Sequence, residues 1–147
     1  MRRFQLGVVI AASVLLTAAC RASGPQGPRL SHEQFVKQMH SICRPVNAMR
    51  GQFGDPAYDK QLLNEGRGEL AQLRKLNPPK TDEDRLSDAF RHWSSALDDF
   101  EDLARAAENK DRAGAEKAFR NAAAEARVIA RLIPDYPVGE CLGEGIG

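Results

Sequence analysis

The sequence predicts an all-α protein, folded as an antiparallel four-helix bundle between residues 31 and 141. Four successive segments repeat apolar side chains in steps of three and four residues, which is the period of an amphipathic helix. Short stretches rich in glycine, proline, asparagine and aspartate separate these segments, and short connections favour antiparallel neighbours. No segment alternates apolar and polar residues in the way that a half-buried strand does. We therefore expect four helices around one core.

The first helix is expected to begin at Ser31, because Gln34 follows it in the spacing of a capping box. Its apolar stripe comprises Phe35, Met39, Ile42, Val46, Met49 and Phe53. Pro45 cannot donate a backbone hydrogen bond to Ser41, and it disfavours helical geometry in the residue before it. We therefore expect this helix to be kinked or broken near Pro45.

The second helix is expected over roughly residues 57–76. Its stripe comprises Leu62, Leu63, Gly66, Leu70, Leu73 and Leu76. A glycine such as Gly66 weakens a helix by about 1 kcal/mol relative to alanine. Its position within the stripe suggests that a neighbouring helix approaches closely there. Asn77-Pro78-Pro79 then ends the helix.

The third and fourth helices have complementary side chains. Thr81 with Asp84 has the spacing of an N-terminal cap, and the third helix is expected to continue to about Ala107. Its stripe comprises Leu86, Phe90, Trp93, Leu97, Phe100 and Ala104. Asp111 is expected to cap a fourth helix that ends near Ile133, with the thinner stripe Ala115, Ala118, Phe119, Ala122, Ala126, Ile129 and Ile133. Small side chains on the fourth helix suit close packing against the bulky third helix.

Residues 1–19 have the features of a signal peptide. A basic start at Arg2-Arg3 precedes the apolar run Leu6–Leu16, and small residues follow before Cys20. Leu16-Thr17-Ala18-Ala19-Cys20 resembles the lipobox of bacterial lipoproteins, in which the cysteine is acylated, for example with palmitate, and the chain is cut before it. We therefore predict lipidation at Cys20 and a location on the extracytoplasmic face of the cell membrane.

Two alternatives to a lipidated Cys20 remain open. An uncleaved transmembrane anchor would need about 20 apolar residues, and the run here is shorter. Ordinary secretion with a cut after Ala19 would leave Cys20 as a free thiol.

The number of cysteines favours lipidation over ordinary secretion. The chain has three cysteines, and an odd thiol is a liability in an oxidising compartment. Lipidation of Cys20 leaves Cys43 and Cys141, for which we predict a disulfide; the alternative is two buried free thiols. In the predicted bundle this bridge is within reach if the C-terminal tail folds back along the helices.

The remaining regions are short. Residues 20–30 are expected to form the lipidated cysteine and a flexible tether, because Arg21–Arg29 is rich in glycine and proline. Residues 142–147 are expected to be a flexible tail. Removing residues 1–19 leaves 128 residues, enough for one domain. It also lowers the 21 basic residues to 19 against 20 acidic ones, a net charge of −1, which argues against nucleic acid as a partner.

Candidate chemical sites are few. The candidate metal or haem ligands are His32, His40, His92, Met39 and Met49. The histidines fall beside the apolar stripes, the methionines fall on them as gap fillers, and ligand motifs such as Glu-x-x-His are absent, so we predict no metal and no cofactor.

Two other sequence patterns have simple structural explanations. Gly66–Ala71 matches a dinucleotide fingerprint but lies inside a helical pattern, where that motif does not function. The densest acidic cluster comprises Asp98, Asp99, Glu101 and Asp102. It is interpreted as a solvated helix face, with a docking face for a basic partner as the alternative.

One resemblance extends over most of residues 31–141. The pattern Leu70-x-x-Leu73-x-x-Leu76-x-Pro78-Pro79, a cysteine in the first helix, an alanine-rich fourth helix and Gly139-x-Cys141 resemble a group of small uncharacterised actinobacterial lipoproteins. The resemblance implies this architecture and location, and it implies no activity.

The function expected from these observations is that of a non-catalytic, lipid-anchored module. It would be held at the membrane through Cys20 and serve in protein interaction, with an unidentified partner, or in envelope organisation. The alternative is a carrier that binds an apolar ligand, such as haem or lipid, within the bundle.

Overall fold

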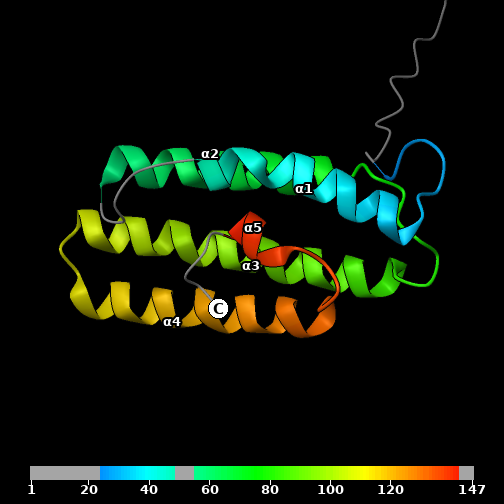
Figure 1. The fold of residues 1–147 in the computed structure, drawn as a ribbon. Coiled ribbons are helices and arrows are strands. Elements are labelled where there is room, and N and C mark those ends of the chain that lie inside the picture. Colours follow the sequence, from blue (N-terminus) through cyan, green and yellow to red (C-terminus); the bar gives the residue numbers. More distant parts are fainter. Residues whose placement is uncertain (1–23, 49–54, 143–147) are drawn as a thin grey trace, which may run out of the picture.

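The computed structural model describes residues 24–48 and 55–142, with side chains described in 24–43 and 55–142. Its helices are α1 (His32–Ala48), α2 (Pro56–Leu73), α3 (Glu83–Glu108), α4 (Arg112–Leu132) and the short α5 (Val138–Leu142). The four long helices run antiparallel in chain order (Figure 1). The predicted all-α four-helix bundle is confirmed.

Helix α3 lies in the middle of the bundle and packs along α4 on one side and α2 on the other (Figure 1). Helix α1 packs on α2 and α5. Within the described part of the chain, α1 and α4 do not meet directly, because α5 and the segment before it lie between them. Residues 134–142, called the C-terminal tail below, thus fill one side of the bundle.

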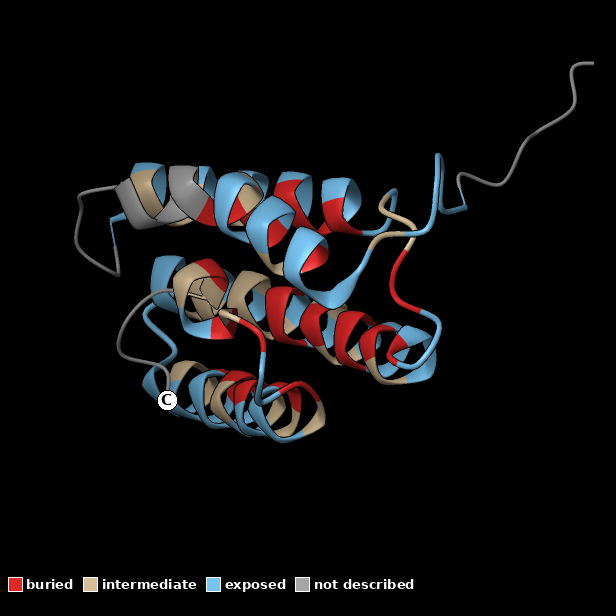
Figure 2. Ribbon diagram, turned by 45° about the vertical axis from the view of Figure 1, so that its right-hand side comes forward, coloured by how far each residue is buried: buried red, intermediate tan, exposed pale blue. Residues whose placement is uncertain are grey.

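The predicted stripes form the core, and the buried residues lie along the inward faces of the helices (Figure 2). The largest fully buried side chains include Trp93, Phe35, Met39, Leu73, Leu86, Ile129 and Ile133. Gly66 has the predicted close approach, since a Cβ atom built there would lie 2.9 Å from a methyl group of Leu97. The core that the structure describes is therefore built from residues between Leu30 and Leu142.

Two helix starts agree with the sequence. The Ser31 hydroxyl accepts a hydrogen bond from the Gln34 backbone, and the Gln34 side chain accepts one from the Ser31 backbone. This is the predicted capping box. The Asp111 carboxylate accepts a hydrogen bond from the backbone of Gly114, as expected for the cap of α4.

The start of α3 differs from the prediction. Asp82, rather than Thr81, is the N-cap residue, and its side chain makes no capping hydrogen bond. Its carboxylate instead binds side chains of the tail and of α3. Asp55 caps α2, because its carboxylate accepts hydrogen bonds from the backbone N–H groups of Ala57 and Tyr58.

Pro45 does not end the first helix, because α1 continues to Ala48. Residues 49–54, between α1 and Asp55, lie outside the described residues. The predicted stripe positions Val46, Met49 and Phe53 fall where side chains are not described.

The C-terminal tail folds back as predicted. After α4 the chain turns at Pro134, and α5 brings Cys141 to Cys43 of α1 in a disulfide with a Cα–Cα distance of 4.6 Å. The ring of Tyr136 packs edge-on against Phe35, with 5.8 Å between the ring centroids. The predicted Cys43–Cys141 pairing is therefore confirmed.

The segment before α1 is attached to the connection between α2 and α3. The Gln26 backbone N–H donates to the carbonyl of Lys75 at 2.7 Å, and that of Leu30 donates to Asn77 at 2.9 Å. The Arg29 guanidinium donates to the carbonyl of Pro78 and to the carboxylate of Glu83. Residues 26–30, which the sequence assigned to the flexible tether, thus lie on the bundle.

Candidate functional site

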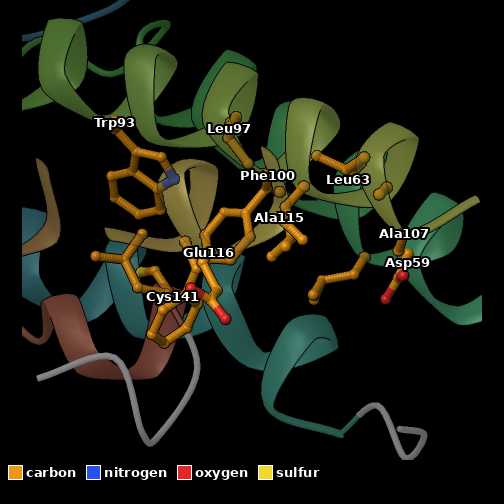
Figure 3. A pocket seen from close by; sticks show the side chains of 15 residues that line it. Asp59, Leu63, Trp93, Leu97, Phe100, Ala107, Ala115, Glu116 and Cys141 are labelled. Carbon is orange, nitrogen blue, oxygen red and sulfur yellow. The ribbon is translucent and has the colours of Figure 1, made fainter. Parts of the chain in front are cut away.

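A cavity of about 410 Å³ opens between α2, α3, α4 and α5, in the half of the bundle that contains the α3–α4 turn (Figures 1 and 3). Its lining comprises Asp59, Leu62, Leu63, Gly66, Trp93, Leu97, Phe100, Leu103, Ala104, Ala107, Ala115, Glu116, Phe119, Cys141 and Leu142. Ligand sites occupy about 300–1,000 Å³ and are mostly apolar with a few polar groups. The cavity has the size and character of a small-molecule site.

The helix stripes account for this cavity. Stripe residues near the α2–α3 connection are largely buried, whereas those around the cavity are only half-buried, as at Leu62, Leu63, Phe100, Ala104 and Ala115. Phe119 on α4 is 51% exposed although it belongs to a predicted stripe. The small side chain of Ala115 leaves space opposite the bulky residues of α3. An apolar surface that the core does not cover is typical of a binding site.

Trp93 supplies a polar group at the inner end of the cavity. Its side chain is fully buried, and its indole Nε1–H has no hydrogen-bond partner in the described part of the chain. Figure 3 shows this nitrogen on the edge of the ring that faces Phe100, and Cys141 lies nearby. Buried tryptophan N–H groups usually find a partner. An unpaired donor beside a cavity suits a ligand that carries an acceptor.

The charged residues of the described lining are both acidic. Asp59 comes from α2 and Glu116 from α4 (Figure 3). Glu116 accepts a hydrogen bond from the Arg112 side chain at 3.0 Å, and Arg112 is itself highly exposed and does not line the cavity. The cavity therefore presents no cation to a ligand from its described lining.

Each of the three histidines that are candidate metal or haem ligands lies beside a carboxylate. His40 Nδ1 is 2.6 Å from an oxygen of Glu140, and His92 Nδ1 is 2.5 Å from an oxygen of Glu125. His32 Nδ1 is 3.3 Å from Asp82. The described residues contain no group of three or more histidine, cysteine or acidic side chains that could hold a metal. The described cavity lining contains no histidine, methionine or tyrosine, and its cysteine, Cys141, is held in the disulfide, so it offers no side chain of the usual kinds for axial ligation of haem.

Asp82 forms a buried polar network that sequence reasoning missed. Its carboxylate accepts hydrogen bonds from the Tyr136 hydroxyl and from Arg85, each at 2.6 Å. The bond from Tyr136, followed by that from Arg85, lowers the pKa of Asp82 to about 2. Burial and the same carboxylate raise the pKa of Tyr136. The network joins the tail to the start of α3, which indicates a structural role.

The acidic cluster on α3 is paired with basic and amide groups. Arg67 of α2 donates to Asp98 at 3.3 Å and to Glu101 at 2.5 Å. The remaining members of the cluster bind the neighbouring side chains Arg105 and Asn121. These contacts favour the interpretation as a solvated face of α3 over a docking face for a basic partner.

Of the predicted site residues, the structure brings together Cys43 and Cys141, and it adds that Cys141 lines the cavity. Cys20 lies outside the described residues. The cavity itself was not predicted. The residues that could have indicated it are Ala115 and Phe119, in the first half of the apolar stripe of α4. They leave a cavity only because of the way α5 packs against the bundle.

None of the helices within residues 24–48 and 55–142 combines the length and apolarity that crossing a membrane requires. No protein-family model, curated protein or solved structure matches the chain.

Proposed function

We propose that this protein is a lipid-anchored extracytoplasmic carrier whose helical bundle binds an apolar small molecule. The observation that carries the proposal is the cavity of about 410 Å³, which α2, α3, α4 and α5 line almost entirely with apolar side chains. Of the functions expected from the sequence, the carrier is the one that this geometry favours. The lack of histidine or methionine in the described lining favours a lipid-like ligand over haem.

The proposed location rests on the signal peptide pattern and on Cys20. The Cys43–Cys141 disulfide supports it, because such bonds persist in oxidising compartments outside the cytoplasm. Because Cys43 and Cys141 are paired with each other, Cys20 is the cysteine of the three that remains for lipidation.

The proposed role is binding rather than catalysis. Acid–base or nucleophilic chemistry needs a suitable side chain within reach of the bound molecule. The described lining contains no histidine, serine, lysine or tyrosine, and Cys141 is held in the disulfide. Its carboxylates are Asp59 and Glu116, and Glu116 is exposed and hydrogen-bonded to Arg112. Its polar groups are suited to orienting a ligand.

Replacing Cys20 tests the location. In Cys20→Ser we expect the protein to be absent from the membrane fraction, because it lacks the acyl chains that would anchor it. Each buried methylene of such a chain contributes about 0.8 kcal/mol to membrane binding. The measurement is fractionation with intact mass of the mature protein. Cys43→Ala/Cys141→Ala, which keeps Cys20, is the matched control and should still carry lipid. A wild-type mature N-terminus without acyl chains would contradict the proposed anchor.

Filling the cavity tests the carrier. In Ala115→Phe, within the chain from Gly24 to Gly147, the new ring occupies space opposite α3, and we expect the dissociation constant of the neutral fluorescent probe phenylnaphthylamine to rise about tenfold or more. The matched control is Ala124→Phe, at an exposed position of the same helix outside the cavity, which should bind as the wild type does. Circular dichroism checks that both variants are folded.

The binding measurement also separates the carrier from an interaction module. If the wild-type protein binds no probe, or if both phenylalanine variants bind it equally well, the carrier proposal fails. The non-catalytic interaction module would then be the better account, with the exposed ring of Phe119 as its candidate contact.

A further inference from the structure

We infer that the ligand of this cavity is an uncharged, single-chain molecule with a carbonyl acceptor, such as an acyl ester, and that its carbonyl oxygen accepts a hydrogen bond from Trp93 Nε1–H. This inference rests on the proposed carrier function and specifies the chemistry that the site recognises.

The indole of Trp93 defines the acceptor. Its Nε1–H is buried and has no partner among the described residues, although the ring borders the cavity and the nitrogen faces Phe100 (Figure 3). Leaving a buried donor unpaired is unfavourable, and a tryptophan N–H can donate but cannot accept. A ligand oxygen at the inner end of the cavity would satisfy this group, whereas a pure hydrocarbon would leave it unpaired.

The acidic residues define the charge of the ligand. Asp59 and Glu116 are the charged members of the described lining, and neither lysine nor arginine contributes to it. A carboxylate or phosphate within the cavity would lose its hydration without gaining a cation, and burial of an unpaired charge is strongly unfavourable. The site therefore selects an ester over the corresponding free acid anion.

The cavity volume defines the size. An engineered cavity of about 150 Å³ binds benzene, which has six carbons. By the same ratio, the volume of about 410 Å³ accommodates roughly 16 non-hydrogen atoms. Methyl dodecanoate, with one acyl chain and one ester, falls in this range, whereas a lipid with several long chains does not.

Competition against phenylnaphthylamine tests the inference with the chain from Gly24 to Gly147. In the wild type we expect methyl dodecanoate to displace the probe and dodecanoate anion to compete about tenfold or more weakly. In Trp93→Phe a smaller phenyl ring replaces the indole, and the N–H is lost. We therefore expect the ester to lose about two- to tenfold more affinity than the probe, which has no carbonyl to accept the hydrogen bond.

A second measurement uses the wild type alone. Trp93 is the single tryptophan of the chain, so intrinsic fluorescence reports on it directly. We expect the ester to shift its emission to longer wavelength, as hydrogen bonding to the indole N–H does. This measurement remains decisive if Trp93→Phe does not fold.

The possible outcomes separate the two proposals. Probe binding with equal or stronger competition by dodecanoate would overturn the neutral-ligand inference and leave the carrier intact. Ester binding that neither shifts the Trp93 emission nor weakens in Trp93→Phe would overturn the role of the indole. No binding of the probe to the wild type would overturn the carrier proposal itself.

Discussion

Reduction of the Cys43–Cys141 disulfide is expected to lower the free energy of unfolding by about 2–5 kcal/mol. The bond joins residues 98 positions apart, and the chain-entropy model assigns about 4.7 kcal/mol to a loop of that length. Because domains of this size are stable by only about 5–15 kcal/mol, the bond accounts for a large part of the total. Urea unfolding of oxidised and reduced protein measures the difference.

The matched variant is Cys43→Ala/Cys141→Ala, whose stability should not respond to reductant. Loss of the bond also removes the covalent link between α1 and α5, whose residues Cys141 and Leu142 form one wall of the cavity. We therefore expect weaker binding of phenylnaphthylamine after reduction under conditions where the bundle is still folded. Equal stability of the oxidised and reduced wild type would refute the prediction.

Tyr136→Phe is expected to lower the free energy of unfolding by about 1.5–3 kcal/mol at neutral pH. The substitution keeps the ring, which packs against Phe35, and removes only the hydroxyl that donates to the Asp82 carboxylate. That carboxylate is buried, so it loses a bond that water does not replace. Denaturant unfolding provides the measurement.

The same variant has a pH signature. Asp82 has a pKa of about 2 in the folded protein, below its ordinary value near 3.8. The ionised Asp82 carboxylate therefore contributes about 2 kcal/mol to the free energy of unfolding above about pH 4, and this contribution is lost as the pH falls toward 2. In Tyr136→Phe we expect a smaller loss across this window, because the bond that contributes most to the lowered pKa is gone.

Asp135→Asn provides the comparison, because this acid is exposed on the same segment of the tail. We expect its stability at neutral pH to stay within about 0.5 kcal/mol of the wild type. A Tyr136→Phe variant that loses as much stability as the wild type between pH 4 and 2 would show that the hydroxyl does not set the pKa of Asp82.

The helices and much of the core could be predicted because their causes are local. The steps of three and four residues that place Phe35, Met39 and Trp93 on one side of a helix are visible in the sequence. The capping pair Ser31 and Gln34 is also a short-range pattern. The disulfide followed from the number of cysteines together with the direction of the tail.

Features that depend on distant contacts were not predictable in the same way. Asp82 resembles an ordinary residue at the start of a helix until Tyr136, 54 positions later, donates to it. Phe119 continues an apolar stripe that would normally be buried, and it is exposed because the elements around it leave a cavity. In both cases the packing of the tail decides the outcome, and local periodicity does not encode that packing.

The backbone hydrogen bonds of Gln26 and Leu30 to the α2–α3 connection indicate which end of the bundle the proposed lipid anchor would join. Only the six peptide steps from Cys20 to Gln26 separate a lipidated cysteine from the bundle, a reach of at most about 20 Å. The cavity residues of α3 begin at Trp93, ten residues or about 15 Å beyond Glu83, and continue away from that end. A lipid at Cys20 would therefore attach near the end of the bundle where α3 begins, and the cavity would lie farther along the bundle from that attachment.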